Sequence, residues 1–270
     1  MLTVLSTVLA ACLITSLHAL PSSQERIVAA ALRGSPGTRI FTPSASNIAD
    51  AQYSVNWAGA ILQAPSDTLR EVTATLTLPN LTPPSGVDPD RTTYWGQAWI
   101  GIDGDQCDGG SARVGFYLYS FYDSDEQVNS LTIPFYQIGY AEDSHSINGL
   151  NVWPGDSVTL TISATSRTAG FMYVTDNARG TTVSVRYAAG APLCRQEAVW
   201  VIEDPVHAGT LSHLPDYGAL TFTNASAAIE DGQRTSRRGP QGAHVVNMFQ
   251  ERLLSDVGVG ASTVSVVYVP

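Results

Sequence analysis

Lysine is missing from this chain, so all 14 basic residues among its 270 residues are arginines. This absence excludes mechanisms that need a lysine amine, such as Schiff-base catalysis, a Ser-Lys dyad or a P-loop lysine. Charged residues amount to only 14%, and the formal net charge is -10. Because a nucleic-acid-binding surface needs clustered basic residues, we expect no nucleic-acid partner.

Histidine is also scarce, with five residues scattered singly along the chain. The sequence contains no His-Glu-x-x-His and no Gly-x-Ser-x-Gly, the signatures of zinc peptidases and of serine hydrolases. We therefore predict neither a metal site nor a cofactor.

The three cysteines point to an exported protein. Cys12 lies in an apolar run, residues 2–17, that ends in Leu17-His18-Ala19, and we interpret residues 1–19 as a secretory signal peptide. Its removal would leave an even pair, Cys107 and Cys194, for which we predict one disulfide bond.

A membrane anchor is the competing interpretation of the apolar run. The run falls short of the ~20 apolar residues that a membrane span needs, and no later segment could span a bilayer. Two N-glycosylation acceptor motifs, beginning at Asn80 and Asn224, agree with a secretory route. We expect a secreted, extracellular protein without membrane attachment after signal removal.

Residues 20–52 differ in composition from the rest of the chain. They carry three arginines but only two acidic residues, with Pro, Ser and Gly between them. A basic leader before an acidic body is typical of a pro-segment that covers an acidic cleft and leaves it when carboxylates protonate. A disordered extension explains the composition equally well. The remaining body, residues 53–270, is long enough for one sizeable core, and we expect one domain and a monomer.

Polar and apolar residues alternate with a period of two through this body, as in half-buried β-strands. Residues 71–78 and 157–163 show the alternation almost without error. Further strand-like runs occur at residues 171–174, 183–185 and 262–268, and turn clusters at 83–86, 153–156 and 176–180. Helical periodicity is scarce, so the pattern predicts an all-β sandwich of two antiparallel sheets.

Five motifs follow one another along the body. They are Asn56-Trp57-Ala58-Gly59-Ala60, Trp99 to Asp105 followed by Cys107, Gly155-Asp156-Ser157, Cys194-Arg195 and Val201-Ile202-Glu203-Asp204. In this order they resemble the eqolisins, a family of secreted acid proteases with a catalytic glutamate and glutamine. The resemblance covers roughly residues 53–270. It implies a concanavalin A-like β-sandwich with an active cleft on the concave face of one sheet, an endopeptidase acting on proteins or peptides, and pairing of Cys107 with Cys194.

The resemblance also implies catalytic roles. Glu203 matches the family's general base, which takes a proton from the attacking water, whereas Arg113 stands where the family has its glutamine. A guanidinium could stabilise the oxyanion in place of the amide, which would preserve catalysis. Alternatively, it could pair bidentately with Glu203, exclude the water and lower the carboxyl pKa by ~1–3 units, leaving an impaired pseudo-peptidase. A gap of roughly 5–7 Å between the two side chains would favour catalysis.

Strand parity predicts which side chains share the cleft face. Gln97, Trp99 and Asp103 fall on one face of their strand, and Arg113 and Tyr117 fall on the same face after the turn. Their aromatic, amide and charged groups suit a cleft that holds an extended peptide.

Two glutamines are candidates for the missing amide. Gln97 shares parity with Trp99, and Gln137 stands at the position of a family glutamate. We expect the substrate to contact Trp99, Asp103, Tyr117, Gln97 and Gln137. Ordinary packing of the aromatic rings and turn chemistry of Asp103 are the alternatives, and a lectin-like module for peptide or carbohydrate is the non-enzymatic alternative.

Overall fold

The computed structural model describes residues 52–86, 93–123, 125, 127–139, 144–207 and 210–270. Throughout these ranges the secondary structure consists of strands and turns, as the alternating pattern predicts. None of the described residues forms a helix that could cross a membrane. The predicted signal peptide and all but the last residue of the predicted pro-segment lie outside the described ranges.

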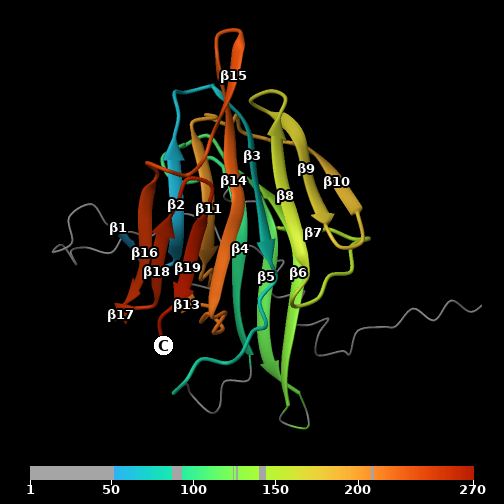
Figure 1. Ribbon diagram of the computed structural model, residues 1–270, viewed down its shortest axis with the longest axis vertical. Coiled ribbons are helices and arrows are strands. Elements are labelled where there is room, and N and C mark those ends of the chain that lie inside the picture. The colour runs from blue at the N-terminus through green and yellow to red at the C-terminus, as the bar shows by residue number, and fades with distance from the viewer. Residues whose placement is uncertain (1–51, 87–92, 124, 126, 140–143, 208–209) are drawn as a thin grey trace, which may run out of the picture. The chain divides into compact units, whose positions relative to one another are not determined.

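The larger sheet has nine strands in the spatial order β1-β16-β2-β11-β4-β5-β6-β7, with β17 paired to β16 (Figure 1). The strands are β1 (Gln52–Ser54), β2 (Trp57–Gln63), β4 (Thr93–Ile102), β5 (Ala112–Tyr122), β6 (Val128–Ile138), β7 (His145–Ser146), β11 (Glu197–Glu203), β16 (His244–Gln250) and β17 (Arg252–Leu253). Its pairs are antiparallel except β1 with β16, which run parallel. The alternation of side chains does not encode strand direction, so this edge pair departs from the prediction.

The second sheet has eight strands in the order β10-β9-β8-β3-β14-β19-β18, with β15 paired to β14. They are β3 (Leu69–Thr77), β8 (Ser157–Ala164), β9 (Ala169–Asp176), β10 (Thr181–Ala188), β14 (Ala219–Asp231), β15 (Arg234–Arg238), β18 (Ser255–Val259) and β19 (Val264–Tyr268). All of its pairs are antiparallel. Two short strands, β12 (Val206–His207) and β13 (Thr210–Leu211), pair separately.

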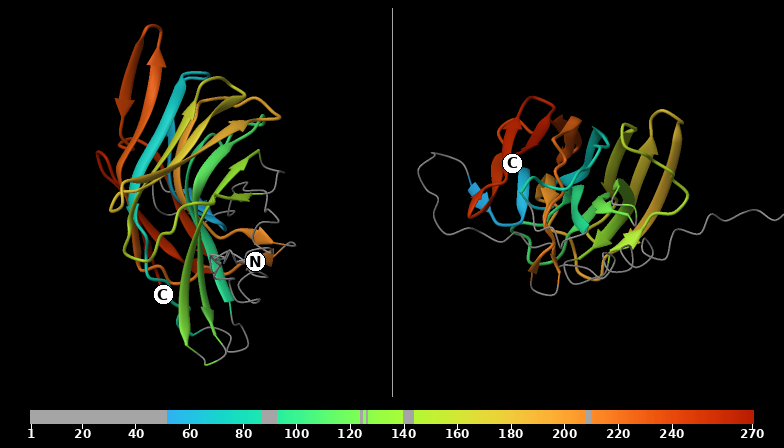
Figure 2. Two further views of the ribbon diagram at one scale, coloured as in Figure 1. Left: turned by 90° about the vertical axis from the view of Figure 1, so that its right-hand side faces the viewer. Right: turned by 90° about the horizontal axis from the view of Figure 1, so that it is seen from below.

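The core lies between the two sheets, which form the two layers visible from the side in Figure 2. In β4, Ala98, Ile100 and Ile102 belong to this core, whereas Gln97 and Trp99 lie outside it. The same division holds in β5. The predicted parity is therefore confirmed: one face of the larger sheet packs into the sandwich, and the other carries the aromatic and polar side chains.

Candidate functional site

Strand β11 brings Glu203 into the middle of the larger sheet. In the strand register Glu203 lies opposite Trp57 of β2 on one side and opposite Gln97 of β4 on the other. Arg113 of β5 lies opposite Gln137 of β6, displaced from the Glu203 row along the strands. Side chains of like parity share a face, so all of these groups stand on the face turned away from the core.

Arg113 spans this displacement and contacts Glu203 directly. Its Nη1 lies 3.2 Å from Glu203 Oε2, and both side chains are only 1% exposed. The guanidinium lies over the Trp99 indole, 4.5 Å from the ring centroid, and Trp99 Nε1 donates a 2.9 Å hydrogen bond to the same carboxylate oxygen. One oxygen of Glu203 thus receives a cationic and a neutral donor, and the indole supports the arginine through a cation–π contact.

Two glycines make room for the Trp99 ring. A Cβ at Gly101 would lie 2.7 Å from Trp99 Cζ3, and a Cβ at Gly115 would lie 2.2 Å from the Ala98 carbonyl oxygen. A side chain at Gly101 would therefore overlap the indole ring, and one at Gly115 would overlap the backbone of β4 and the Cβ of Trp99. Trp57 packs edge-on against it, with the ring centroids 5.1 Å apart.

Burial dominates the electrostatics of Glu203. Desolvation raises the pKa of its carboxyl above the usual range, while the positive charge of Arg113 and the hydrogen bond from Trp99 oppose this rise. Arg113 does lower this pKa, as the pairing alternative expects, but burial raises it by more, so the net pKa lies above the usual range. The carboxyl loses more by leaving water than it gains from the guanidinium.

The neighbouring Asp204 is a second buried carboxyl. Burial raises its pKa to about 6, against the lowering effect of hydrogen bonds from Gln250 and Ser212. Ser212 Oγ donates to Oδ1 at 2.7 Å, and Gln250 Nε2 donates to Oδ2 at 2.9 Å. The charge of Asp204 also contributes to the raised pKa of Glu203.

The distance between Arg113 and Glu203 answers one question that the sequence leaves open. The gap of roughly 5–7 Å expected for a water between them is not present, because the two side chains touch. The described contact joins one nitrogen to one oxygen, and at 3.2 Å it is longer than the ~2.7–2.9 Å of a strong charge-assisted bond.

The other predicted substrate-binding side chains gather on the same face. Gln97 lies between Glu203 and Tyr117 in the register, and Gln97, Tyr117 and Gln137 are buried. Their contact with substrate stays a prediction. Trp95, which the sequence analysis did not include, shares the parity of Gln97 and stacks on Tyr119 with the ring centroids 6.1 Å apart.

Asp103 holds a turn, as the alternative of turn chemistry expects. Its backbone is left-handed, with φ of 63°, and its fully buried carboxylate accepts the backbone N–H groups of Arg195, Gln196 and Glu197 at 2.8, 2.9 and 3.2 Å. Burial raises its pKa, and these hydrogen bonds oppose the rise. The contacts match turn chemistry, since both oxygens hold the chain that leads into β11, and contact of Asp103 with substrate stays a prediction.

Glu197, which the sequence analysis missed, holds this turn from the other side. Its carboxylate accepts the N–H groups of Asp105 and Gln106, each within 2.9 Å, and the side-chain amide of Gln63 at 3.2 Å. Strand parity could have identified Glu197 from the sequence, because it lies six residues before Glu203 and therefore on the same face of β11.

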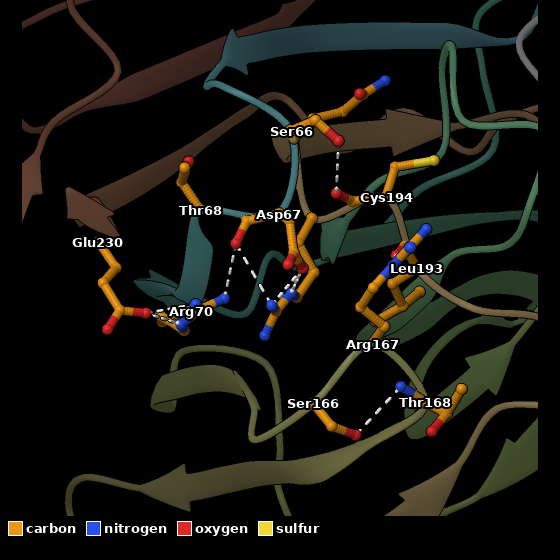
Figure 3. Close-up of polar contacts among 12 residues, drawn as sticks. Ser66, Asp67, Thr68, Arg70, Ser166, Arg167, Thr168, Leu193, Cys194 and Glu230 are labelled. Carbon is orange, nitrogen blue, oxygen red and sulfur yellow. Dashed lines mark hydrogen bonds and ion pairs between the residues drawn. The ribbon is translucent and has the colours of Figure 1, made fainter. Parts of the chain in front are cut away.

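The predicted disulfide between Cys107 and Cys194 is confirmed, with the Cα atoms 5.8 Å apart. Figure 3 shows how the segment around Cys194 is attached to neighbouring turns. The Cys194 carbonyl accepts the N–H of Asp67 at 2.8 Å and the hydroxyl of Ser66 at 3.5 Å, and Arg167 Nε donates to the Leu193 carbonyl at 2.8 Å. These contacts, together with those of Asp103, secure the start of β11.

Among the described residues, the one group of acidic, sulfur or imidazole side chains close enough to hold a metal ion is Asp103, Cys107 and Cys194. Both sulfurs belong to the disulfide and are not thiolates, so this group does not fit a metal. The predicted glycosylation sites Asn80 and Asn224 are both exposed, and their modification stays a prediction.

Comparisons with known proteins agree with this geometry. The Peptidase A4 family matches residues 55–268. Scytalidopepsin B of Scytalidium lignicola is 30% identical over 253 residues, which cover 89% of this chain and 86% of that protein. Aspergillopepsin-2 of Aspergillus niger is 28% identical over 234 residues, covering 81% of this chain and 79% of that protein. The crystal structure of scytalido-glutamic peptidase with a peptide-based transition-state analogue superposes with a TM-score of 0.63 at 26% identity, covering 80% of this chain and 98% of that one.

Proposed function

Because this chain belongs to the Peptidase A4 family, we propose that it is a glutamic-type endopeptidase that hydrolyses peptide bonds in proteins at acidic pH. The relatives named above include glutamic peptidases. The observation that carries the proposal is the buried carboxylate of Glu203, which faces away from the core beside two donors, Arg113 and Trp99.

Glu203 acts as the general base in this proposal. Its ionised carboxylate takes a proton from a water molecule while the water oxygen bonds to the scissile carbonyl carbon. The carbonyl oxygen becomes an oxyanion in the tetrahedral intermediate. Glu203 then returns the proton to the amide nitrogen as the C–N bond breaks, so the products are a carboxylic acid and an amine.

Arg113 stabilises the oxyanion. Its guanidinium is a permanent cation with several N–H donors, and in the substrate complex it turns from Glu203 Oε2 toward the carbonyl oxygen. This movement releases the carboxylate oxygen for the attacking water. The Trp99 ring beneath the guanidinium keeps it on this face of the sheet during the movement.

The pKa of Glu203 sets the acid limit of this activity. The base works only when ionised, so a raised pKa moves the acid limb of the pH profile above that of an exposed glutamate. Arg113 opposes the rise in pKa. Replacing Arg113 with a neutral side chain should therefore move the acid limb to still higher pH.

The direct contact between Arg113 and Glu203 favours one alternative function. If the guanidinium does not leave the carboxylate, no water reaches the base, and the chain is a pseudo-peptidase that binds peptides without cleaving them. The two functions predict opposite effects of removing Arg113.

Proteolysis of an unfolded protein at pH 3–6 by wild type, Glu203→Gln and Arg113→Gln tests both functions. We expect Glu203→Gln to be inactive. Arg113→Gln restores the family's glutamine, an oxyanion donor, and should change kcat only modestly, whereas a further variant without a donor, Arg113→Ala, should lose ~10²–10³-fold in kcat. Activity that appears only in Arg113→Gln would establish the pseudo-peptidase. Inactive wild type and Arg113→Gln, both folded by circular dichroism, would overturn the peptidase. Arg238→Gln, on the exposed strand β15, is the matched control.

Export is also part of the proposal. A disulfide between Cys107 and Cys194 and two exposed acceptor asparagines support passage through the secretory pathway. After expression in a secreting host, we expect the chain to start beyond residue 19 and to lose mass on treatment with an N-glycosidase. A secreted chain that keeps residues 1–19 would contradict the signal peptide.

A further inference from the structure

A pocket of about 330 Å³ is lined by side chains that include neither Glu203 nor Arg113. Its wall includes Tyr94 of β4, which has the parity of the core-facing Ala98 and is thus on the opposite face of that strand from Trp99. Arg252 of β17 and Tyr268 of β19 complete the wall from the C-terminal strands. The pocket is therefore distinct in its lining from the candidate catalytic residues, although Gln250, which also lines it, donates to the neighbouring Asp204.

The pocket combines an apolar floor with a cationic rim. Leu214, Leu254 and the rings of Tyr94 and Tyr268 form the floor. Arg252 stands on the rim; it is exposed, and none of the ion pairs between described residues includes it. Such a combination fits a ligand with an apolar body and one negative charge.

Arg252 sets the local charge of the pocket. Burial raises the pKa of the Tyr268 hydroxyl, and among the nearby charges Arg252 has the largest effect on that pKa, which it lowers. Asp216 and Asp204 act in the opposite direction with smaller individual effects. His213 also lines the pocket.

The backbone around the rim is held in uncommon conformations. His213 has φ of 63° and Glu251 has φ of 59°, and both are non-glycine residues. The left-handed Glu251 reverses the chain so that Gln250 and Arg252 pair directly and present their side chains to the same side. Strained residues of this kind persist where the surrounding structure fixes them and concentrate at binding sites.

We propose that this pocket binds the C-terminal end of a peptide whose last residue is apolar. Arg252 would hold the terminal carboxylate through two parallel N–H···O bonds, and the last side chain would enter between Leu214 and Leu254. A volume near the lower end of the ~300–1,000 Å³ typical of small-molecule sites fits one or two residues. The identity of the ligand rests on the proposed function, because every peptide bond that the enzyme hydrolyses releases a new C-terminal carboxylate.

Isothermal titration calorimetry on the processed full-length protein tests this inference. The probe is N-acetyl-alanyl-leucine at pH 5, compared with its C-terminal amide. We expect the acid to bind at least about tenfold more tightly than the amide, since charge-assisted hydrogen bonds to Arg252 are lost with the charge. Arg252→Gln should weaken binding of the acid about tenfold or more, and Leu254→Phe should reduce it by filling the floor. Arg238→Gln is the matched control and should bind as wild type does.

Several outcomes would overturn the inference. They are equal binding of acid and amide, no binding by wild type up to about 10 mM, or equal affinities of Arg252→Gln and Arg238→Gln. Octanoate that binds more tightly than the dipeptide would assign the pocket to a fatty acid instead. Because Glu203→Gln should still bind the probe, a failure of the peptidase proposal leaves this measurement intact, and a failure here leaves the peptidase proposal intact.

Discussion

Strand β11 carries a buried glutamate at each end, and the two have opposite surroundings. The carboxylate of Glu197 accepts two backbone N–H groups from a neighbouring turn and the side-chain amide of Gln63 at the end of β2. Glu203 is just as buried, yet its described donors are the side chains of Trp99 and Arg113, and burial raises its pKa. Residue type, strand and face are the same at both positions, so the donors decide which glutamate can do chemistry.

The physical reason lies in what each donor can do afterwards. Backbone N–H groups are fixed by the chain, and a carboxylate that they hold is committed to the structure. Side-chain donors can turn away, so a carboxylate that they hold can take up a water or a proton. The adjacent disulfide and Asp103 further stabilise the chain around Glu197. Glu203, in contrast, is followed directly by Asp204, another buried carboxyl.

Replacing each of the two glutamates separately by glutamine should give the largest difference between the two ends of β11. Glu203→Gln should lose all measurable activity because the base is gone, while the folded fraction is followed separately because its buried partner Arg113 loses the counter-charge. Glu197→Gln should keep its kcat but lose ~1–3 kcal/mol of unfolding free energy, because an amide nitrogen would then face backbone donors. Peptidase assays and urea unfolding measure both. Loss of kcat in a folded Glu197→Gln protein would break the distinction between the two ends.

Removing the disulfide tests the Glu197 end of β11 alone. Cys107 and Cys194 enclose a segment with a sequence separation of 87 residues, for which chain entropy gives about 4.6 kcal/mol. The double variant Cys107→Ser with Cys194→Ser should melt well below wild type while its kcat per folded molecule stays the same. Unchanged thermal melting would contradict a stabilising role for the bond.

The pH dependence of stability tests the other end of β11, where Asp204 follows Glu203. Asp204 has a folded pKa of about 6, above its usual 3.8, so the fold favours its protonated form. Stability from this group is lost as pH rises from about 4 to 6, by about 3 kcal/mol in all. Wild type should melt roughly 6–12 °C lower at pH 7 than at pH 4, and Asp204→Asn should flatten this slope. Carboxyls with lowered pKa, such as Asp156 and Asp176, act below pH 4 and do not mask it. A slope unchanged in Asp204→Asn would refute the assignment to this carboxyl.

The smallest expected effect comes from the neutral donor at Glu203. Trp99→Phe keeps an aromatic ring under Arg113 but removes the indole N–H that lowers the carboxyl pKa. The acid limb of the kcat/KM profile should therefore move to higher pH by a fraction of a unit, since one hydrogen bond contributes ~1 kcal/mol. Tyr173→Phe, on the second sheet, is a control that should leave the profile unchanged. A shift to lower pH in Trp99→Phe would show that the indole does not act on the ionised carboxylate.

Much of the fold could be predicted from local pattern. The alternating runs correspond to strands β3, β8, β9, β10 and β19, and parity separated the core residues of β4 from Trp99 and its neighbours. The parallel pairing of β1 with β16 was not predictable, because strand direction depends on distant partners. Within the site, Glu203 and Arg113 were identified by motif, but Glu197 and Trp95 were not, although both have the parity of the face they share.

The sequence by itself determined the all-β class, the separation of the two faces and the disulfide between Cys107 and Cys194, because each follows from local alternation or from ordered motifs. Tertiary structure alone decided that Arg113 reaches across Trp99 to Glu203 and that Asp103 holds a turn. Distances between strands far apart in sequence depend on register. The sign of a pKa shift depends on how much water burial removes, and neither quantity is encoded in any single segment of the chain.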